Sequence, residues 1–280
     1  MVTGAPFVVL DKSEDFSRIT NSSDLELIET ELDVLGQSLC LRIAASNEPI
    51  KLSGIVPLAH IVCARIISAV ERHIISSGNT IACRPKCSNC CRYLVPVTVP
   101  EAMWLTETAR KMAQSDRRVL YEFSLFATRR ILELTSKHYL SRFSDVKAEA
   151  APKLKQLSDW YSSLNLSCPF LENDLCMLYE QRPIACREHL ALGAGPNGCE
   201  RNCPEHVRRV RMPVSVAEAL EQLTNDVECK PVETIVLPFV FAWCRANRDY
   251  FERTWPAARL VSRFINILVA RSRQPPMGST

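Results

Sequence analysis

The stretch ACRPKCSNCC, residues 82–91, places four cysteines within ten positions and decides how the middle of the chain folds. Its thiols follow a C-x3-C-x2-C-C spacing and are Cys83, Cys87, Cys90 and Cys91. Cysteines two or three residues apart in a turn can converge on one metal centre, because the backbone between them curls. Adjacent side chains diverge in helix and strand alike, so Cys90 and Cys91 indicate a polynuclear centre, two centres, or a separate role for one of them.

A second thiol-rich stretch spans residues 168–203. Its cysteines are Cys168, Cys176, Cys186, Cys199 and Cys203. Four thiolates from each stretch would supply eight ligands, enough for two four-thiolate sites or one larger cluster. Zinc and iron both accept four thiolates, so the spacing leaves the metal open. Any single cysteine can instead be a small buried hydrophobe. We expect that core or incidental role for the four remaining cysteines, Cys40, Cys63, Cys229 and Cys244.

Composition narrows the class of protein. The 280 residues are 47% hydrophobic, and 34 basic residues against 31 acidic ones leave a net charge of +3. This balance gives no global attraction for nucleic acid or an anionic membrane. The N-terminus has no basic region ahead of its short apolar run, and the apolar run 234–244 is about half of a membrane span. We therefore expect a cytoplasmic protein whose thirteen cysteines serve metal binding or redox chemistry.

Apolar periodicity predicts a mainly α fold with an irregular, loop-rich cysteine region. Helical spacing is read over 22–46 and from Leu58 to Ile74, and Thr98 with Glu101 is spaced as a capping box at a further helix start. Strand signals are sparse. The predicted organisation is a flexible leader (1–20), N-terminal helices (21–78), a cysteine-cluster metal-binding domain (79–272) and a flexible tail (273–280).

The spacing of Cys83, Cys87 and Cys90 also matches the C-x3-C-x2-C motif of radical S-adenosylmethionine enzymes. Those enzymes commonly carry an aromatic residue just before the last cysteine, where this chain has Asn89. No alternating β-α pattern follows the motif, so the barrel of those enzymes is not indicated. Radical chemistry is kept as an alternative only.

With both stretches in view, the sequence resembles the YkgJ-type cysteine-cluster family of zinc- or iron-chelating domain proteins. The resemblance is carried by CSNCCRYLVPVTVPEA (87–102) and CPFLENDLCMLYEQRPIACREHL (168–190). It implies a chelating set of Cys87, Cys90, Cys91, Cys168, Cys176 and Cys186, which Cys83 and Cys199 complete. Cys203 is additional, so the last ligand stays open between Cys199 and Cys203. A relative, the flagellin lysine methylase, carries a similar cluster, which makes a peptide or protein a possible substrate.

Two arginines flank Cys186. Guanidinium groups of Arg182 and Arg187 near thiolates would offset negative charge and donate hydrogen bonds to sulfur, although a salt bridge or helix-end contact is an equal alternative. Pro183 is expected to open the helix that carries Cys186, with its first N–H groups directed at thiolates. His189 could be a ligand or a proton donor, but a lone histidine more often satisfies an ordinary hydrogen bond.

Three functions follow from these residues. The first is a metal-binding protein that holds an iron–sulfur cluster such as 4Fe–4S, or iron or zinc, with a structural or redox role. The second is an iron-centre-dependent enzyme that modifies a peptide, a protein or a small molecule, in the manner of the lysine methylase or of radical S-adenosylmethionine enzymes. The third is a thiol-based oxidation sensor. No nucleic-acid or membrane partner is expected.

Overall fold

The computed structural model describes residues 6–10, 25–85, 87–138, 158–193, 208–231 and 234–274 of the 280-residue chain. Of these residues 54% are helical and 19% are in strands, which confirms the mainly α prediction. The longer helices are α1 (Val56–Ser76), α2 (Val99–Lys111), α3 (Gln114–His138), α7 (Val216–Glu228) and α9 (Ala257–Ser272). Shorter ones are α6 (Ile184–Glu188), α8 (Val240–Ala246) and the 3-10 turns η2 (Leu52–Ile55), η3 (Tyr179–Gln181), η6 (Leu237–Phe239) and η7 (Arg248–Phe251).

The helix expected over 22–46 is wrong. Residues 25–46 form a β-hairpin of β2 (Leu25–Val34) and β3 (Gln37–Ser46), and β1 (Phe7–Leu10) pairs antiparallel with the free side of β3. Leu35 and Gly36 both have positive φ, 55° and 76°, as a two-residue hairpin turn requires. The apolar residues of this stretch fit both periodicities, and the turn at Gly36 is the signal that separates them.

The remaining strands are two-residue pairs that fasten loops to one another. They are β4 (Pro49–Ile50) with β11 (Trp255–Pro256), β5 (Pro96–Val97) with β10 (Ile235–Val236), β6 (Leu171–Glu172) with β7 (Leu175–Cys176), and β8 (Ala191–Leu192) with β9 (Arg208–Arg209).

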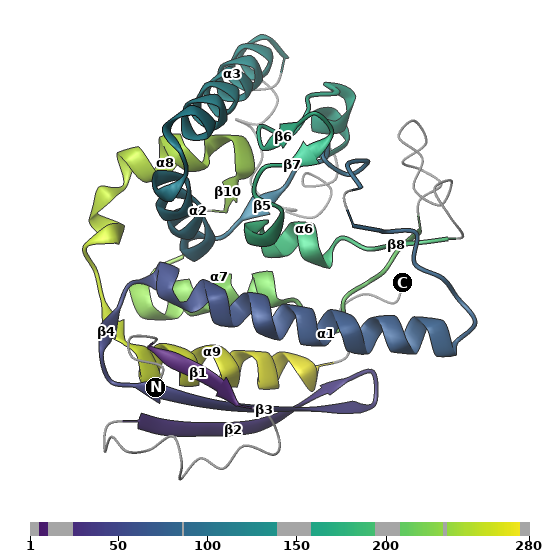
Figure 1. Ribbon diagram of the computed structural model, residues 1–280, viewed down its shortest axis with the longest axis vertical. Coiled ribbons are helices and arrows are strands. Elements are labelled where there is room, and N and C mark those ends of the chain that lie inside the picture. Colours follow the sequence, from purple (N-terminus) through teal and green to yellow (C-terminus); the bar gives the residue numbers. More distant parts are fainter. Residues whose placement is uncertain are drawn as a thin grey trace.

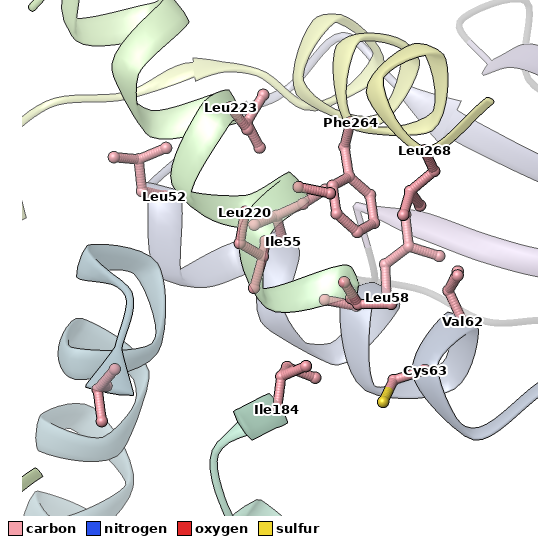
Figure 2. Close-up of a cluster of buried hydrophobic side chains, with 14 of the residues drawn as sticks. Leu52, Ile55, Leu58, Val62, Cys63, Ile184, Leu220, Leu223, Phe264 and Leu268 are labelled. Atoms are coloured by element: carbon pink, nitrogen blue, oxygen red, sulfur yellow. The ribbon is translucent and has the colours of Figure 1, made fainter. Parts of the chain in front are cut away.

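The core lies between α1, α7 and α9, with the three-stranded sheet against α9 (Figure 1). Figure 2 shows Leu58, Leu220 and Phe264, one from each helix, meeting in this cluster. Cys63 is fully buried among them, and Cys244 is also buried, so both agree with the expected core role. Ile184 at the start of α6 reaches the same cluster from the cysteine-rich side (Figure 2). The cysteine region is thereby built on the main core.

One helix in the described part of the chain, Leu52–Ser76, is long and apolar enough to cross a membrane by length and composition alone. More than half of its apolar window, 56%, is buried inside the protein. Its buried residues include Leu58, Val62 and Ile66, which pack in the core cluster. A core helix of this kind passes the same test, so the expectation of no membrane partner stays a prediction.

α2 and α6 position the cysteine region. α2 begins with the expected capping box between Thr98 and Glu101, which confirms that prediction. α6 contacts α1, α7 and β5, and Figure 1 shows it between α2 and α1. The segments that carry the cysteines therefore lie on the upper side of α1, away from the three-stranded sheet (Figure 1).

Candidate metal centre

The two cysteine segments, 82–91 and 168–203, lie side by side where they are described. The backbone N–H of Cys168 donates to the carbonyl of Cys91 at 2.7 Å. The Ser88 hydroxyl donates to Asp174 Oδ1 at 3.3 Å, and a guanidinium nitrogen of Arg92 lies 3.2 Å from Ser167 Oγ. These three links join parts of the chain that are more than 70 residues apart, as the metal hypothesis requires.

The first segment ends in a turn. The N–H of Cys91 donates to the Ser88 carbonyl at 3.0 Å, and the N–H of Tyr93 donates to the Cys90 carbonyl at 3.1 Å. A hydrogen bond between the Cys90 and Cys91 thiols raises the pKa of Cys90, and burial raises it further. The neighbouring side chains are thus in contact, and the expectation that they diverge is wrong, because the backbone here is neither helical nor extended.

The second segment presents Cys176 from a tight hairpin. β6 and β7 are joined by Asn173 and Asp174, whose φ angles of 49° and 60° are tolerated best by asparagine and aspartate among non-glycine residues. Cys176 pairs with Leu171 in this hairpin. The turn thereby fixes the position of Cys176 relative to Cys168, whose carbonyl accepts the Leu171 N–H at 3.0 Å.

Cys186 is carried by α6, which begins after Pro183 as predicted. The first N–H of the helix, that of Ile184, donates to Glu101 Oε1 at 2.6 Å, and no thiolate receives it. The other oxygen, Glu101 Oε2, accepts the Thr98 hydroxyl and N–H at 2.7 and 3.1 Å. Glu101 is 1% exposed, and burial raises its pKa. One carboxylate therefore caps two helices, and sequence reasoning recognised only the nearer of them.

A second carboxylate ties the far end of α6 to α7. Glu188 Oε1 accepts the Val216 N–H at 2.5 Å, and Oε2 accepts the Ser215 hydroxyl at 2.9 Å. Burial raises the pKa of Glu188 to about 7. Arg187 donates from Nε to the Arg182 carbonyl at 3.1 Å and also to the carbonyl of Glu180. The five residues of α6 are thus held at both ends by side chains.

The thiols of both segments share one electrostatic environment centred on Cys90. Burial raises the pKa of each of Cys83, Cys168, Cys176 and Cys186, and a thiolate at Cys90 would raise each of them further. Arg182 acts in the opposite direction on Cys83, Cys90, Cys176 and Cys186. A thiolate at Cys90 thus interacts with thiols of both segments, in agreement with the hydrogen bond that joins Cys168 to Cys91.

The structure gives less information on the other predicted ligands. Cys83 Sγ accepts the Ala191 N–H at 3.2 Å, and a thiolate at Cys87 would raise the pKa of Cys83. Cys91 contacts Cys90 as described above. Cys199, like Cys203, lies outside the described residues. Their assignment as the last ligand stays a prediction.

Arg182 and Arg187 have different surroundings. Arg182 stacks its guanidinium over the Tyr179 ring at 4.4 Å, and its buried Nε has no hydrogen-bond partner in the described part of the chain. Its charge acts on four thiols of the cysteine segments, whereas Arg187 interacts with Cys186 and with Cys63 of α1. Arg187 is engaged with backbone carbonyls, which is the helix-end contact of the sequence analysis. Cofactor binding by either side chain stays a prediction.

A cavity of about 340 Å³ adjoins the thiols. Cys90 and Cys186 lie in its wall, together with Tyr93, Glu188 and His189. The His189 ring packs 5.5 Å from the Tyr93 ring, its buried Nε2 is without a partner among the described residues, and burial lowers its pKa to about 4. The neutral imidazole that shares this wall with two thiols is available for a hydrogen bond at Nε2.

The donor set suits a soft or borderline cation. The cysteines in the described residues form no disulfide, and the described residues contain no group of three or more His, Cys, Asp or Glu side chains close enough to hold one metal ion. Thiols whose pKa is raised by burial stay protonated on their own, and a bound cation replaces those protons. Thiolates are ligands of zinc and of iron–sulfur clusters, so the residues fit both.

Comparison with known proteins agrees with this chemistry. The CxxCxxCC family model, described as "Putative zinc- or iron-chelating domain", matches residues 82–229. This range contains both cysteine segments and more than half of the chain. Neither the curated proteins nor the solved structures contain a match to it.

Proposed function

This chain belongs to the CxxCxxCC family of zinc- or iron-chelating domains, and from that premise we propose that its thiols hold an iron–sulfur cluster. The observation that carries the proposal is the adjacency of the two cysteine segments: the Cys168 N–H donates to the Cys91 carbonyl, and Cys90 and Cys186 line one cavity. We propose Cys83, Cys87, Cys90, Cys91, Cys168, Cys176 and Cys186 as sulfur ligands, with Cys199 as the eighth.

More thiols are present than one zinc ion uses, and this supports a polynuclear centre. A zinc site takes four ligands, whereas the seven described candidates lie on two adjoining segments. Such a centre supplies one-electron redox chemistry when bound. The chain's own contribution is to bury the thiols, to offset their charge with Arg182, and to hold Cys186 through Glu101.

X-ray absorption on anaerobically purified protein tests the proposal. We expect iron with sulfur neighbours, short iron–iron distances and a brown protein. Colourless protein with stoichiometric zinc and four sulfur neighbours would refute the cluster and keep the family's chelating function. Cys90→Ser should lose most of the metal, whereas Cys40→Ser, on β3 outside the cluster, should keep it.

A second candidate function is favoured by the cavity beside Cys90 and Cys186. An iron-centre-dependent enzyme needs room for a substrate or S-adenosylmethionine next to the metal, and a space of about 340 Å³ lies there. A peptide or small molecule that enters it would meet His189 and Glu188 as proton-holding groups. We place this activity in a reducing, cytoplasmic compartment, where the thiols stay free for the metal.

Ligand count separates the two functions. Full sulfur coordination at every iron leaves no position for a substrate, whereas an iron with a nitrogen or oxygen neighbour has an open site. Addition of S-adenosylmethionine should change the electron paramagnetic resonance spectrum of the reduced protein only in the second case. Loss of metal with reversible disulfides under mild peroxide would instead identify the oxidation sensor.

A further inference from the structure

A second and larger cavity lies outside the two cysteine segments, although Cys244 of α8 is part of its lining. Its volume is about 810 Å³, within the range of small-molecule sites. It is formed by α2, α3, α8 and the turns η6 and η7, and Figure 1 shows α2, α3 and α8 grouped together at the end of the molecule farthest from the three-stranded sheet. None of the proposed thiol ligands lines it.

Part of the lining of this cavity is aromatic. Tyr121 of α3 and Phe241 of α8 meet edge to face, with ring centroids 4.6 Å apart, and Phe251 of η7 continues the surface. Leu125, which also lines the cavity, is 50% exposed although it is a large apolar side chain. Apolar surface of this kind is stabilised by a ligand that removes it from water.

The same lining carries positive charge. Arg110, Arg245 and Arg248 line the cavity, and among the described residues Glu252 is the one carboxylate beside them. Arg110 lies over the Phe251 ring at 5.5 Å, and in the described part of the chain none of the three arginines forms an ion pair. Guanidinium groups match carboxylate and phosphate oxygens with paired hydrogen bonds, so these arginines favour an anionic head group.

A buried hydroxyl gives independent evidence for a ligand. Ser124 lines the cavity, is 3% exposed, and its Oγ has no hydrogen-bond partner among the described residues. A buried polar group without a partner is costly, and a ligand atom or a water molecule in the cavity relieves that cost. By contrast, the Thr128 hydroxyl in the same wall is satisfied by the Pro238 carbonyl at 2.8 Å.

From these observations we infer that the cavity binds an organic anion with an apolar body and a carboxylate or phosphate head. The body packs against Tyr121, Phe241 and Phe251, and the head is held by Arg245 and Arg248 with Arg110 beside them. Ser124 offers one further hydrogen bond. This site is independent of the metal centre and of the proposed function.

Isothermal titration of the full-length, as-purified protein with dodecanoate, dodecyl phosphate and dodecanol tests the inference. Both anions should bind more tightly than the neutral alcohol by about tenfold or more, and the tighter anion identifies the head group. Equal binding of all three ligands, or no binding of either anion, would overturn it.

Variants locate the site. The double change Arg245→Gln with Arg248→Gln should weaken anion binding by about tenfold, while Arg129→Gln with Arg259→Gln, which removes the same charge from exposed positions outside the cavity, should leave it within about twofold. Ser124→Ala should weaken it by about fivefold. Unfolding midpoints without ligand show that each variant is folded, and equal losses in both double variants would contradict the assignment.

Discussion

Glu101→Ala should destabilise the protein more than any surface charge change on the same helix. The structure gives three hydrogen bonds to this carboxylate: from the Ile184 N–H at 2.6 Å, and from the Thr98 hydroxyl and N–H at 2.7 and 3.1 Å. Alanine removes all of them and leaves the Ile184 N–H without an acceptor at a buried position.

The magnitude follows from these contacts. An orphaned buried donor costs roughly 1–3 kcal/mol, and the loss of a helix cap costs about 1 kcal/mol. Removal of a buried carboxylate whose pKa is raised by desolvation recovers part of this cost. The net expectation is a loss of about 2–3 kcal/mol, and Glu101→Gln, which keeps an acceptor for Ile184, should lose about 1 kcal/mol.

Urea unfolding followed by circular dichroism, with metal content measured on the same samples, gives the test. Glu107→Ala is the matched control on α2. In the described part of the chain its carboxylate pairs with the Lys51 ammonium at 3.6 Å, and the Lys51 side chain is 45% exposed, so the change should cost less than about 1 kcal/mol. Cys186 follows the start of α6, so Glu101→Ala should also lower metal occupancy. Equal stability of the two alanine variants would refute the role of Glu101 as a shared cap.

Three further predictions concern other parts of the molecule. Burial and Arg187 lower the pKa of His60 to about 4, so folding favours the neutral ring. The wild type should therefore lose up to about 3 kcal/mol relative to His60→Gln as the pH falls from 6.5 to 4, measured by urea unfolding at several pH values, and parallel curves would contradict this. Gly36→Ala places a side chain at φ 76° in otherwise open space and should cost roughly 1 kcal/mol of strain; an unchanged urea midpoint would show that the hairpin turn adapts. Arg182→Gln removes a positive charge that acts on four thiols, so it should make the midpoint potential of the centre more negative by tens of millivolts. Arg182→Lys keeps the charge and should keep the potential. A potentiometric titration that finds the same potential in Arg182→Gln and the wild type would contradict this effect of the arginine on the metal centre.

The sequence was informative wherever the cause of structure is local. The capping box of Thr98 and Glu101 lies within one turn of α2, and Pro183 precedes the helix that it starts. The proximity of the two cysteine segments was also predicted, because thiols that bind one metal centre have to lie close together. The helix prediction was wrong for residues 25–46, because their apolar positions fit both a helical and a strand periodicity. Pairing with β1 in a sheet decided between the two.

Contacts between distant segments could not be predicted in the same way. The Ile184 N–H lies 83 residues from Glu101, and Glu188 reaches Ser215 and Val216 at the start of α7. Nothing in the local sequence distinguishes a glutamate that caps a remote helix from one that faces water. The charged side chains next to the thiols were noticed, but Glu101 and Glu188, which fix the position of Cys186, were not assigned that role.

Because Glu101 and Glu188 hold α6 in place, the metal is not needed to position Cys186. A helix of five residues is not stable alone, because the conformational entropy lost in forming its first turn exceeds what its few hydrogen bonds return. α6 is stabilised by Ile184, which packs in the core cluster, and by caps from Glu101 and Glu188. None of these three residues is a cysteine. The main core thus sets the place of Cys186 before any metal binds. The turn that presents Cys90 and Cys91 is held differently: Ser88, Cys91 and Arg92 form hydrogen bonds to residues in or next to the second segment, and neither cysteine belongs to the core cluster. We therefore expect removal of metal to expose residues 87–93 to exchange or proteolysis before it loosens α6.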